Sequence, residues 1–369
     1  MRRVVLAGAS GYGRGYLRQL AELERAGRVE LAGVCEIAEL DAEGRELVGD
    51  RPVRADLPAL LAETRPDVGI VATPIPTHDR LARAVLDAGA HLLLEKPPVP
   101  ALAQWQALRK TVRDRGLVCQ LGFQSLGSEA VARLAALVRD GELGHLRGIG
   151  VRGAWSRTDA YYRRAAWAGR RTLDGQPVVD GALTNPFAHA VATALAVDGS
   201  TGVEDVVSCE LELWRCRDIE ADDTSCLRLR TRHGTVIVVA VTLCAVEEAE
   251  PVVVVHGSRG RAELAYTEDL LTVDGVTTRF PRISPLENLL SHLDDPAVPL
   301  RSALDDAGAF MRVLEAVRLA PEPARIPGRF VRREGEWVGL PGIEAVLAQA
   351  AERLATFREL GAPWAGWLP

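Results

Sequence analysis

The 369-residue sequence has no long apolar segment, since no apolar run reaches the roughly 18 residues that a membrane-spanning helix needs. Residues 1–10 begin directly with a strand pattern, without an apolar signal region. Positive charge is not in excess either, because the formal net charge is −6, which disfavours nucleic acid as a partner. We therefore expect a cytoplasmic protein with neither a membrane nor a nucleic acid as its partner.

Cysteine pairs at metal-binding spacing are also missing. The 6 cysteines are scattered and form no Cys-x-x-Cys motif. In a long chain without a signal segment we expect them to be reduced core residues, and we expect no metal site. The cysteines are Cys35, Cys119, Cys209, Cys216, Cys226 and Cys244.

Lysine is almost absent. Lys96 and Lys110 are the only lysines among the 44 basic residues, and all the others are arginine. A lysine that persists against this bias is a candidate for a role that a planar guanidinium cannot fill. For either lysine taken alone, chance is an equally good explanation.

The first third of the chain alternates short apolar strands with amphipathic helices. This rhythm is typical of βαβ units and a parallel sheet. The predicted strands are Arg2–Gly8, Val29–Cys35, Val68–Ala72, His91–Leu94 and Val118–Gly122, and the predicted helices are Tyr16–Arg25, Leu57–Thr64, His78–Ala88 and Ala101–Arg115.

After about residue 125 the pattern changes to longer β-rich segments. Seven such runs lie between His145 and Phe280, and helices are predicted at Ser128–Arg139, Leu300–Leu319 and Ile343–Leu360. The runs predict an open, mostly antiparallel sheet with one covered face. There is no internal repeat and no low-complexity linker.

A glycine-rich turn joins the first predicted strand to the first helix. Its sequence is Gly8-Ala9-Ser10-Gly11-Tyr12-Gly13, with Ser10 at the middle position of the common Gly-x-Gly-x-x-Gly spacing. Glycines at such a turn let the backbone approach a pyrophosphate, which the helix N-terminus attracts. A plain strand–helix corner is the alternative, and the strand–turn–helix context favours a dinucleotide site that includes Gly8, Ser10, Gly11, Tyr12 and Gly13.

Glu36 directly follows the second predicted strand. A carboxylate there accepts hydrogen bonds from the ribose hydroxyls of NAD and repels the 2′-phosphate of NADP. Ile37 and Ala38 follow, so no adjacent arginine favours that phosphate. We predict NAD rather than NADP, with a solvated strand-end glutamate as the alternative.

Two further polar segments follow the next strands at their carboxyl ends, where ligands bind in open α/β sheets. One runs through Thr73, Pro74 and His78, and the other is Glu95-Lys96-Pro97. We expect Thr73, Pro74, His78 and Glu95 to contribute to the cofactor site. Lys96 could hydrogen-bond a substrate hydroxyl and lower the pKa of that hydroxyl in the transition state.

These motifs, with Gly141-Glu142-Leu143-Gly144 after them, resemble the Gfo/Idh/MocA family of oxidoreductases along essentially the whole chain. The resemblance implies a Rossmann domain at residues 1–125 and an α+β domain at residues 126–369 with a large open sheet. The second domain would bind substrate, and its sheet would pair subunits into a homodimer or homotetramer. In the catalytic segment of the family, His189 matches the histidine that relays the proton of the substrate hydroxyl.

The chain departs from the family at Asn185, where the resemblance implies an aspartate. Asparagine can bind a substrate but cannot ionise, so we expect the pKa of His189 to be lower than it would be beside a carboxylate. Asp180 could supply that charge, although its position cannot be predicted from the sequence. A structural histidine on a helix is the alternative for His189.

An aromatic and arginine-rich segment provides candidate substrate contacts. Tyr162 and Trp167 could stack on a sugar, and Arg164 could bind a carboxylate or phosphate. An amphipathic surface helix explains the segment equally well.

Together these features favour an NAD-dependent dehydrogenase that acts on a secondary hydroxyl of a sugar, polyol or sugar acid, with Lys96, Asn185 and His189 as catalytic residues. Two alternatives stay open. One is a redox-neutral enzyme that oxidises a sugar transiently, and the other is a non-catalytic dinucleotide-binding regulator.

Overall fold

The computed structural model describes residues 1–366 and divides the chain into two compact units. The first unit contains Met1–Gly122 and Pro285–Leu304, and the second contains Phe123–Ser284 and the chain from Asp305 onward. Within the described residues, no helix combines the length and apolar character needed to cross a bilayer.

The first unit is built on a parallel sheet of six strands in the order β3-β2-β1-β4-β5-β6. This order confirms the predicted α/β class with an N-terminal parallel sheet. The strands are β1 (Arg2–Ala7), β2 (Val29–Cys35), β3 (Val53–Arg54), β4 (Val68–Val71), β5 (His91–Leu94) and β6 (Cys119–Leu121).

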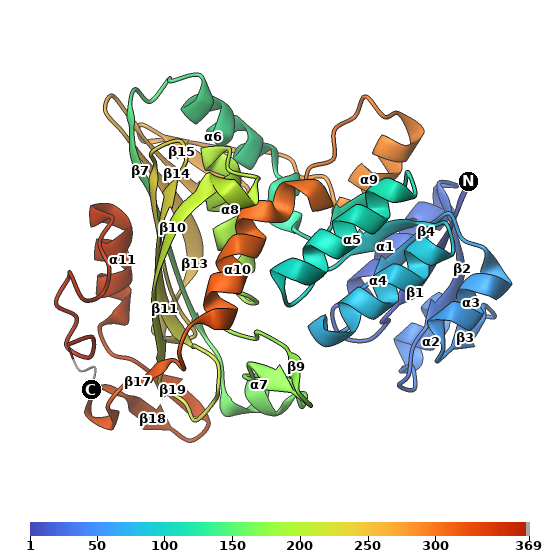
Figure 1. Cartoon of the computed structure of the whole chain (residues 1–369), viewed down its shortest axis with the longest axis horizontal. Coiled ribbons are helices and arrows are strands. Elements are labelled where there is room, and N and C mark those ends of the chain that lie inside the picture. Colours follow the sequence, from blue (N-terminus) through green and yellow to red (C-terminus); the bar gives the residue numbers. More distant parts are fainter. Residues whose placement is uncertain (367–369) are drawn as a thin grey trace. The chain divides into compact units, whose positions relative to one another are not determined.

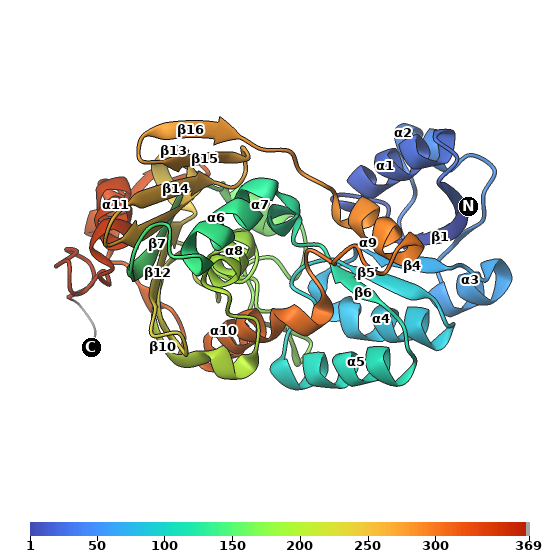
Figure 2. The ribbon, with the colours of Figure 1, turned by 90° about the horizontal axis from the view of Figure 1, so that it is seen from above.

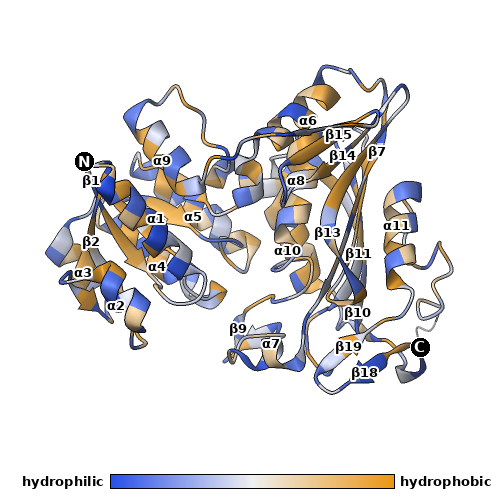
Figure 3. Ribbon diagram, turned by 180° about the vertical axis from the view of Figure 1, so that it is seen from behind, coloured by the Kyte–Doolittle hydropathy of each residue, from blue (hydrophilic) through white to orange (hydrophobic). Residues whose placement is uncertain are grey.

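Helices cover both faces of this sheet, with α1 and α2 on one face and α4 and α5 on the other (Figure 2). Each helix buries its apolar side, as Leu17, Leu20 and Leu23 of α1 show. Figure 3 shows the apolar central strands in orange and the polar sides of α1 and α4 in blue. The helices are α1 (Gly13–Arg25), α2 (Ala42–Val48), α3 (Leu57–Thr64), α4 (His78–Asp87) and α5 (Leu102–Asp114).

A distant segment completes the first unit. Helix α9 (Pro285–Asp294) returns to pack Leu286, Leu289 and Leu290 into the same core as Tyr16 and Leu17. The sequence-based division placed this segment with the second domain. Its apolar residues need a hydrophobic core, and this packing provides one within the first unit.

The second unit contains a sheet of nine strands in the order β16-β15-β14-β13-β7-β12-β11-β10-β17. Most neighbours pair antiparallel, whereas β7 with β12 and β10 with β17 pair parallel, which agrees with the predicted mostly antiparallel sheet. The strands are β7 (Leu146–Ser156), β10 (Val206–Arg215), β11 (Thr224–Thr231), β12 (Val236–Thr242), β13 (Cys244–Gly257), β14 (Arg261–Ala265), β15 (Leu270–Val273), β16 (Val276–Arg279) and β17 (Ala324–Arg325).

Helices lie on both faces of this sheet, with α8 and α10 on one face and α11 on the other (Figure 1). The sequence predicted a single covered face. Helix α11 and the chain after it bury Leu347, Phe357 and Trp364 against sheet residues such as Val238 and Ala240, so part of the expected open face is covered. The helices are α6 (Glu129–Arg139), α7 (Asp159–Arg163), α8 (Ala188–Asp198), α10 (Gly308–Leu319) and α11 (Ile343–Arg353), and two short hairpins, β8 (Thr172–Leu173) with β9 (Gln176–Pro177) and β18 (Arg332–Glu334) with β19 (Trp337–Gly339), lie outside the sheet.

Candidate functional site

The glycine-rich turn after β1 is sterically restricted to glycine at two positions. Gly8 has φ +85°, and a Cβ there would lie 2.7 Å from the carbonyl oxygen of Ala72. A Cβ on Gly13 would lie 1.7 Å from the carbonyl oxygen of Gly8. The space around Gly11 is open, and no side chain caps the start of α1. The turn therefore fits the pyrophosphate of a dinucleotide, which the N-terminal end of α1 would attract.

Glu36, at the end of β2, contacts this turn directly. Its Oε2 atom accepts hydrogen bonds from the backbone N–H groups of Ala9 at 2.9 Å and Ser10 at 3.1 Å, and its Oε1 atom accepts those of Ile37 and Ala38. Burial alone would raise the pKa of Glu36, but these hydrogen bonds outweigh it, so the pKa lies below its usual value. At neutral pH a negative charge therefore lies beside the turn, where it suits the ribose hydroxyls of NAD.

His78 links the loops that follow β4 and β5. Its side chain is buried, with Nε2 2.7 Å from the carbonyl oxygen of Thr73 and Nδ1 3.0 Å from that of Pro97. Burial lowers the pKa of His78, against the effect of these hydrogen bonds. The ring thus braces two loops from within, whereas Thr73 and Pro74 remain on the loop that the sequence assigned to the cofactor.

Glu95 is buried beside Lys96 at the end of β5. Its Oε1 atom accepts a hydrogen bond from the hydroxyl of Tyr16 at 2.6 Å, and its Oε2 atom accepts one from the backbone N–H of Lys96 at 3.1 Å. A Cβ on Gly122 would lie 2.3 Å from Glu95, so the carboxylate has little room to move. Glu95 therefore fixes the backbone that carries the half-buried Lys96.

In the second unit, an irregular segment leads from Asp180 into α8 and carries both Asn185 and His189. Asn185 and His189 are half-buried, and the ring of His189 packs edge-on against Phe123 with 5.7 Å between ring centroids. The side-chain amide of Asn185 donates a hydrogen bond from Nδ2 to Oδ1 of Asp180 at 2.5 Å. The structure therefore brings Asp180 into direct contact with the position at which the chain departs from the family.

The aromatic and arginine-rich segment divides into two groups. The guanidinium of Arg164 lies over the rings of Tyr161, at 3.5 Å, and Trp167, at 4.6 Å, and reaches 3.9 Å from Asp180. Tyr162 points elsewhere, toward the buried Arg217. Arg164 and Trp167 therefore belong with Asp180 and Asn185, and Tyr162 belongs with a neighbouring cavity.

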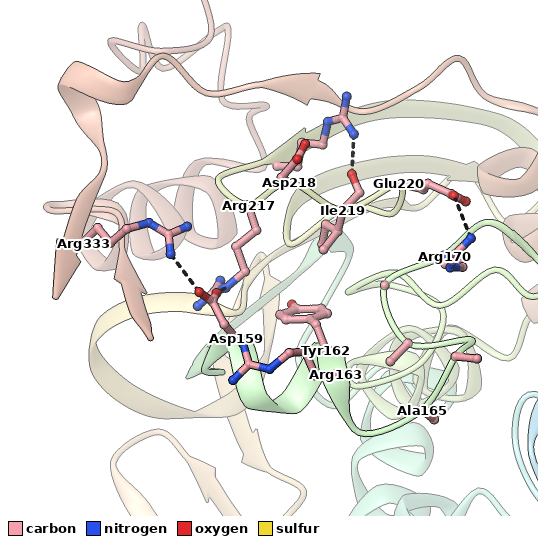
Figure 4. A pocket seen from close by; sticks show the side chains of 14 residues that line it. Asp159, Tyr162, Arg163, Ala165, Arg170, Arg217, Asp218, Ile219, Glu220 and Arg333 are labelled. Atoms are coloured by element: carbon pink, nitrogen blue, oxygen red, sulfur yellow. Dashed lines mark hydrogen bonds and ion pairs between the residues drawn. The ribbon is translucent and has the colours of Figure 1, made fainter. Parts of the chain in front are cut away.

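That cavity has a volume of about 540 Å³ and is shown in Figure 4. Tyr162 and Ile219 provide apolar wall, and the charged lining residues are mostly paired with opposite charges, as Arg333 is with Asp159 at 2.8 Å and Arg170 is with Glu220 at 3.7 Å. The lining nevertheless holds five arginines against three carboxylates, so it carries an excess of positive charge. The lining residues are Asp159, Tyr162, Arg163, Ala165, Ala166, Ala168, Gly169, Arg170, Arg215, Arg217, Asp218, Ile219, Glu220 and Arg333.

A buried cluster of two cysteines and one aspartate near this cavity was not predicted from the sequence. Ligand atoms of Cys216, Asp223 and Cys244 lie within 4.8 Å of one another. Nη1 of Arg217 lies 2.9 Å from Sγ of Cys244, and Asp223 accepts hydrogen bonds from the backbone N–H of Cys216. The guanidinium already supplies positive charge to this group, so the cluster has the character of a structural ion pair. No spacing in the sequence indicates it, because Cys216 and Asp223 lie at the two ends of the β10–β11 loop and Cys244 begins β13.

Two family models match the chain. Residues 2–123 match the model described as the oxidoreductase family with an NAD-binding Rossmann fold, and residues 131–263 match the GFO/IDH/MocA C-terminal domain. The first unit is therefore an NAD-binding Rossmann domain with NAD as its cofactor, and the turn and Glu36 described above fit that ligand.

Curated relatives match mainly through short stretches. A 4-carboxy-2-hydroxymuconate-6-semialdehyde dehydrogenase from Sphingobium sp. is 32% identical over 32% of this chain and 38% of its own length. D-glucoside 3-dehydrogenase from Escherichia coli is 30% identical over 32% of this chain and 34% of its own length. These matches span little more than a third of the relatives. A putative UDP-kanosamine synthase oxidoreductase subunit from Amycolatopsis mediterranei is 26% identical over 72% of this chain and 79% of its length.

Solved structures share the fold over most of the chain. The WlbA dehydrogenase from Bordetella pertussis, solved with NADH and UDP-GlcNAcA, has a TM-score of 0.70 at 22% identity and covers 86% of this chain and 94% of its own. GenD2 from gentamicin A biosynthesis, solved with NAD, has a TM-score of 0.66 at 21% identity and covers 85% of this chain and 92% of its own. At these identities the likeness concerns the fold.

Proposed function

The chain belongs to the Gfo/Idh/MocA family of oxidoreductases, and from that premise we propose that it transfers a hydride between NAD and a secondary hydroxyl of a sugar, polyol or sugar acid. Sugar dehydrogenases among its relatives support a small carbohydrate as the substrate.

One observation of the first unit carries this proposal. The strands β1, β4 and β5 are adjacent and parallel, so their carboxyl ends meet at one edge of the sheet. The nucleotide turn, Thr73 and Lys96 follow these three strands in that order. An amine donor beside a dinucleotide turn, at the edge where α/β sheets bind ligands, is the arrangement that a hydroxyl dehydrogenase needs.

NAD supplies the hydride acceptor when it is bound. The ammonium of Lys96 donates a hydrogen bond to the substrate oxygen and stabilises the negative charge that grows there as the proton leaves. The imidazole of His189 accepts that proton, and Asn185 binds a neighbouring hydroxyl of the substrate as a neutral partner. Glu36 selects NAD over NADP, since its charge repels a 2′-phosphate.

The second unit offers two features that fit a carbohydrate. Tyr161 and Trp167 place aromatic rings beside Asp180, with Arg164 stacked over both, and the arginine-rich cavity next to Tyr162 suits a sugar acid. Tyr162, Arg164 and Trp167 remain our candidates for substrate contacts. A carboxylate on the substrate would find Arg164 as its closest match, because a guanidinium binds carboxylates in bidentate fashion.

We further propose that the protein forms a homodimer or homotetramer through its large sheet. Helix α11 covers part of one face, so the pairing surface would lie over strands farther from it, such as β15 and β16, where Val276 is 70% exposed.

The test is net NADH formation with purified protein, NAD and a panel of sugars, polyols and sugar acids. We expect at least one substrate to give continuous NADH formation that the Lys96→Met variant lacks. Bound NAD that is reduced and then reoxidised without net NADH would instead favour the redox-neutral alternative. Tight NAD binding without any reduction would favour the regulator.

A further inference from the structure

The family resemblance implies an aspartate where this chain has Asn185, and the structure shows what accompanies the change. Nδ2 of Asn185 lies 2.5 Å from Oδ1 of Asp180, five positions earlier in the chain. An ionised carboxylate only accepts hydrogen bonds, so it holds the NH₂ group of the amide toward itself. The carbonyl oxygen of Asn185 therefore faces away from Asp180.

Asp180 is well placed to fix this orientation. Its side chain is 2% exposed, and its Oδ2 atom accepts a hydrogen bond from the backbone N–H of Gly169 at 2.7 Å. Nη2 of Arg164 lies 3.9 Å from the same oxygen and offsets part of the charge. Both oxygens accept from N–H donors, which is the arrangement of an ionised carboxylate.

We propose that Asp180 is a positioning residue that orients Asn185 so that the carbonyl oxygen of Asn185 accepts a hydrogen bond from a substrate hydroxyl next to the reacting one. This inference rests on the proposed dehydrogenase function. In the family pattern one aspartate provides both a hydrogen-bond acceptor and a negative charge. Here Asn185 provides the acceptor, and Asp180 provides the charge one hydrogen bond farther away.

With an asparagine at position 185, the proton of the reacting substrate hydroxyl must go to another group. The amide of Asn185 cannot take it up, so the O–H bond breaks as an N–H bond forms on His189, while the hydride leaves the substrate carbon for NAD. His189 lacks a directly adjacent carboxylate at position 185, so its pKa should lie below that of an enzyme with the family pattern.

Exchanging the two side chains tests the proposal. In Asp180→Asn, the new side chain can still accept the N–H of Gly169, but its NH₂ group then meets the NH₂ group of Asn185. Asn185 must rotate and present a donor to the substrate. We expect kcat to fall roughly 10- to 100-fold, the loss typical for a hydrogen bond to a charged group, with a smaller change in KM.

The single variant Asn185→Asp places two carboxylates at hydrogen-bonding distance, and we expect it to lose activity as well. The double variant Asp180→Asn/Asn185→Asp restores one donor and one acceptor with the family residue at position 185. We expect kcat to recover to within about threefold of the wild type, and the acid limb of kcat/KM to move to higher pH. The reason is that the carboxylate introduced at position 185 would favour the imidazolium form of His189.

Two controls separate positioning from folding. Asp198→Asn changes another buried carboxylate, at the far end of α8, and should alter neither kcat nor the acid limb. The side-chain amide of Asn185 can also be followed by ¹⁵N NMR without turnover. Its signal should exchange slowly in the wild type and rapidly in Asp180→Ala.

The outcomes separate the two proposals. A folded Asp180→Asn variant with wild-type kcat, a double variant that fails to recover, or an Asn185 amide that exchanges rapidly in the wild type would each overturn the role of Asp180. A wild-type chain that keeps the slow Asn185 signal but reduces no NAD would remove the dehydrogenase function itself, and with it the catalytic role of the pair.

Discussion

Oε2 of Glu36 lies 2.9 Å from the backbone nitrogen of Ala9, so the end of β2 is tied to the turn that follows β1. The carboxylate accepts four backbone hydrogen bonds in total, which matches its roughly four lone-pair sites. Glu36 therefore shapes the turn as well as facing the expected ribose, and a ribose hydroxyl would have to share or displace one of these donors.

Glu36 should determine the choice between NAD and NADP. We expect the wild type to bind NAD at least about tenfold more tightly than NADP, or about 1.4 kcal/mol. Glu36→Gln removes the charge and places an NH₂ group against backbone donors, so NAD binding should weaken about tenfold and the preference should shrink. Titration of both nucleotides measures this, with the exposed Glu39→Gln as control. Equal affinities in the wild type would remove Glu36 from the site.

The two lysines provide a matched pair of variants. Lys96→Arg should keep NAD binding but lower kcat by roughly 10²- to 10⁴-fold, because a planar fork cannot replace a compact donor at the substrate oxygen. Lys110→Arg should change nothing, since Lys110 is 76% exposed and pairs with Asp114 on the surface of α5. Near wild-type turnover in Lys96→Arg would show that Lys96 has no catalytic role.

The brace formed by His78 predicts a pH-dependent contribution to stability. The pKa of His78 is lowered in the folded chain, so the ring stays neutral there while the unfolded chain takes up a proton below about pH 6.5. The stability that His78 contributes is therefore present above that pH and lost as the pH falls toward the folded pKa.

The neutral ring has one N–H, which it donates to the carbonyl oxygen of Thr73 or of Pro97. His78→Phe leaves that carbonyl without its donor, at a cost of about 1–3 kcal/mol near neutral pH. Urea unfolding should show that the difference in the free energy of unfolding between wild type and variant becomes smaller as the pH falls. A free-energy difference that stays constant or grows in acid would contradict a lowered pKa of His78. His233→Phe, at an exposed position, serves as the control.

The segment after α11 should behave as part of the core. Phe357 is fully buried with Val238 and Ala240, so Phe357→Ala should lower the free energy of unfolding by about 3–5 kcal/mol. Leu319→Ala, at a 65% exposed site, should have little effect. Light scattering should give the same mass for both variants and the wild type. A lower mass for Phe357→Ala alone would place this segment in a subunit interface.

The sequence was sufficient for features that depend on local spacing. The strand–turn–helix pattern around Gly8–Gly13 and the end of β2 at Cys35, directly before Glu36, both agree with the structure. Features that depend on distant contacts could not be predicted. Helix α9 has an apolar side that any sheet could accept. Asp180 meets Asn185 across an irregular turn, in which the hydroxyl of Thr184 donates to the carbonyl oxygen of Val179, and residue spacing does not indicate such a turn.

The central claim is that the protein transfers a hydride from a carbon atom of the substrate to NAD. A single-turnover experiment with excess protein, NAD and the substrate found in the panel, deuterated at the reacting carbon, tests it directly. The account predicts that mass spectrometry finds the deuterium in the reduced nicotinamide, and that Lys96→Met prevents this. Reduced cofactor without deuterium, or no reduced cofactor with any carbohydrate tested, would contradict the account.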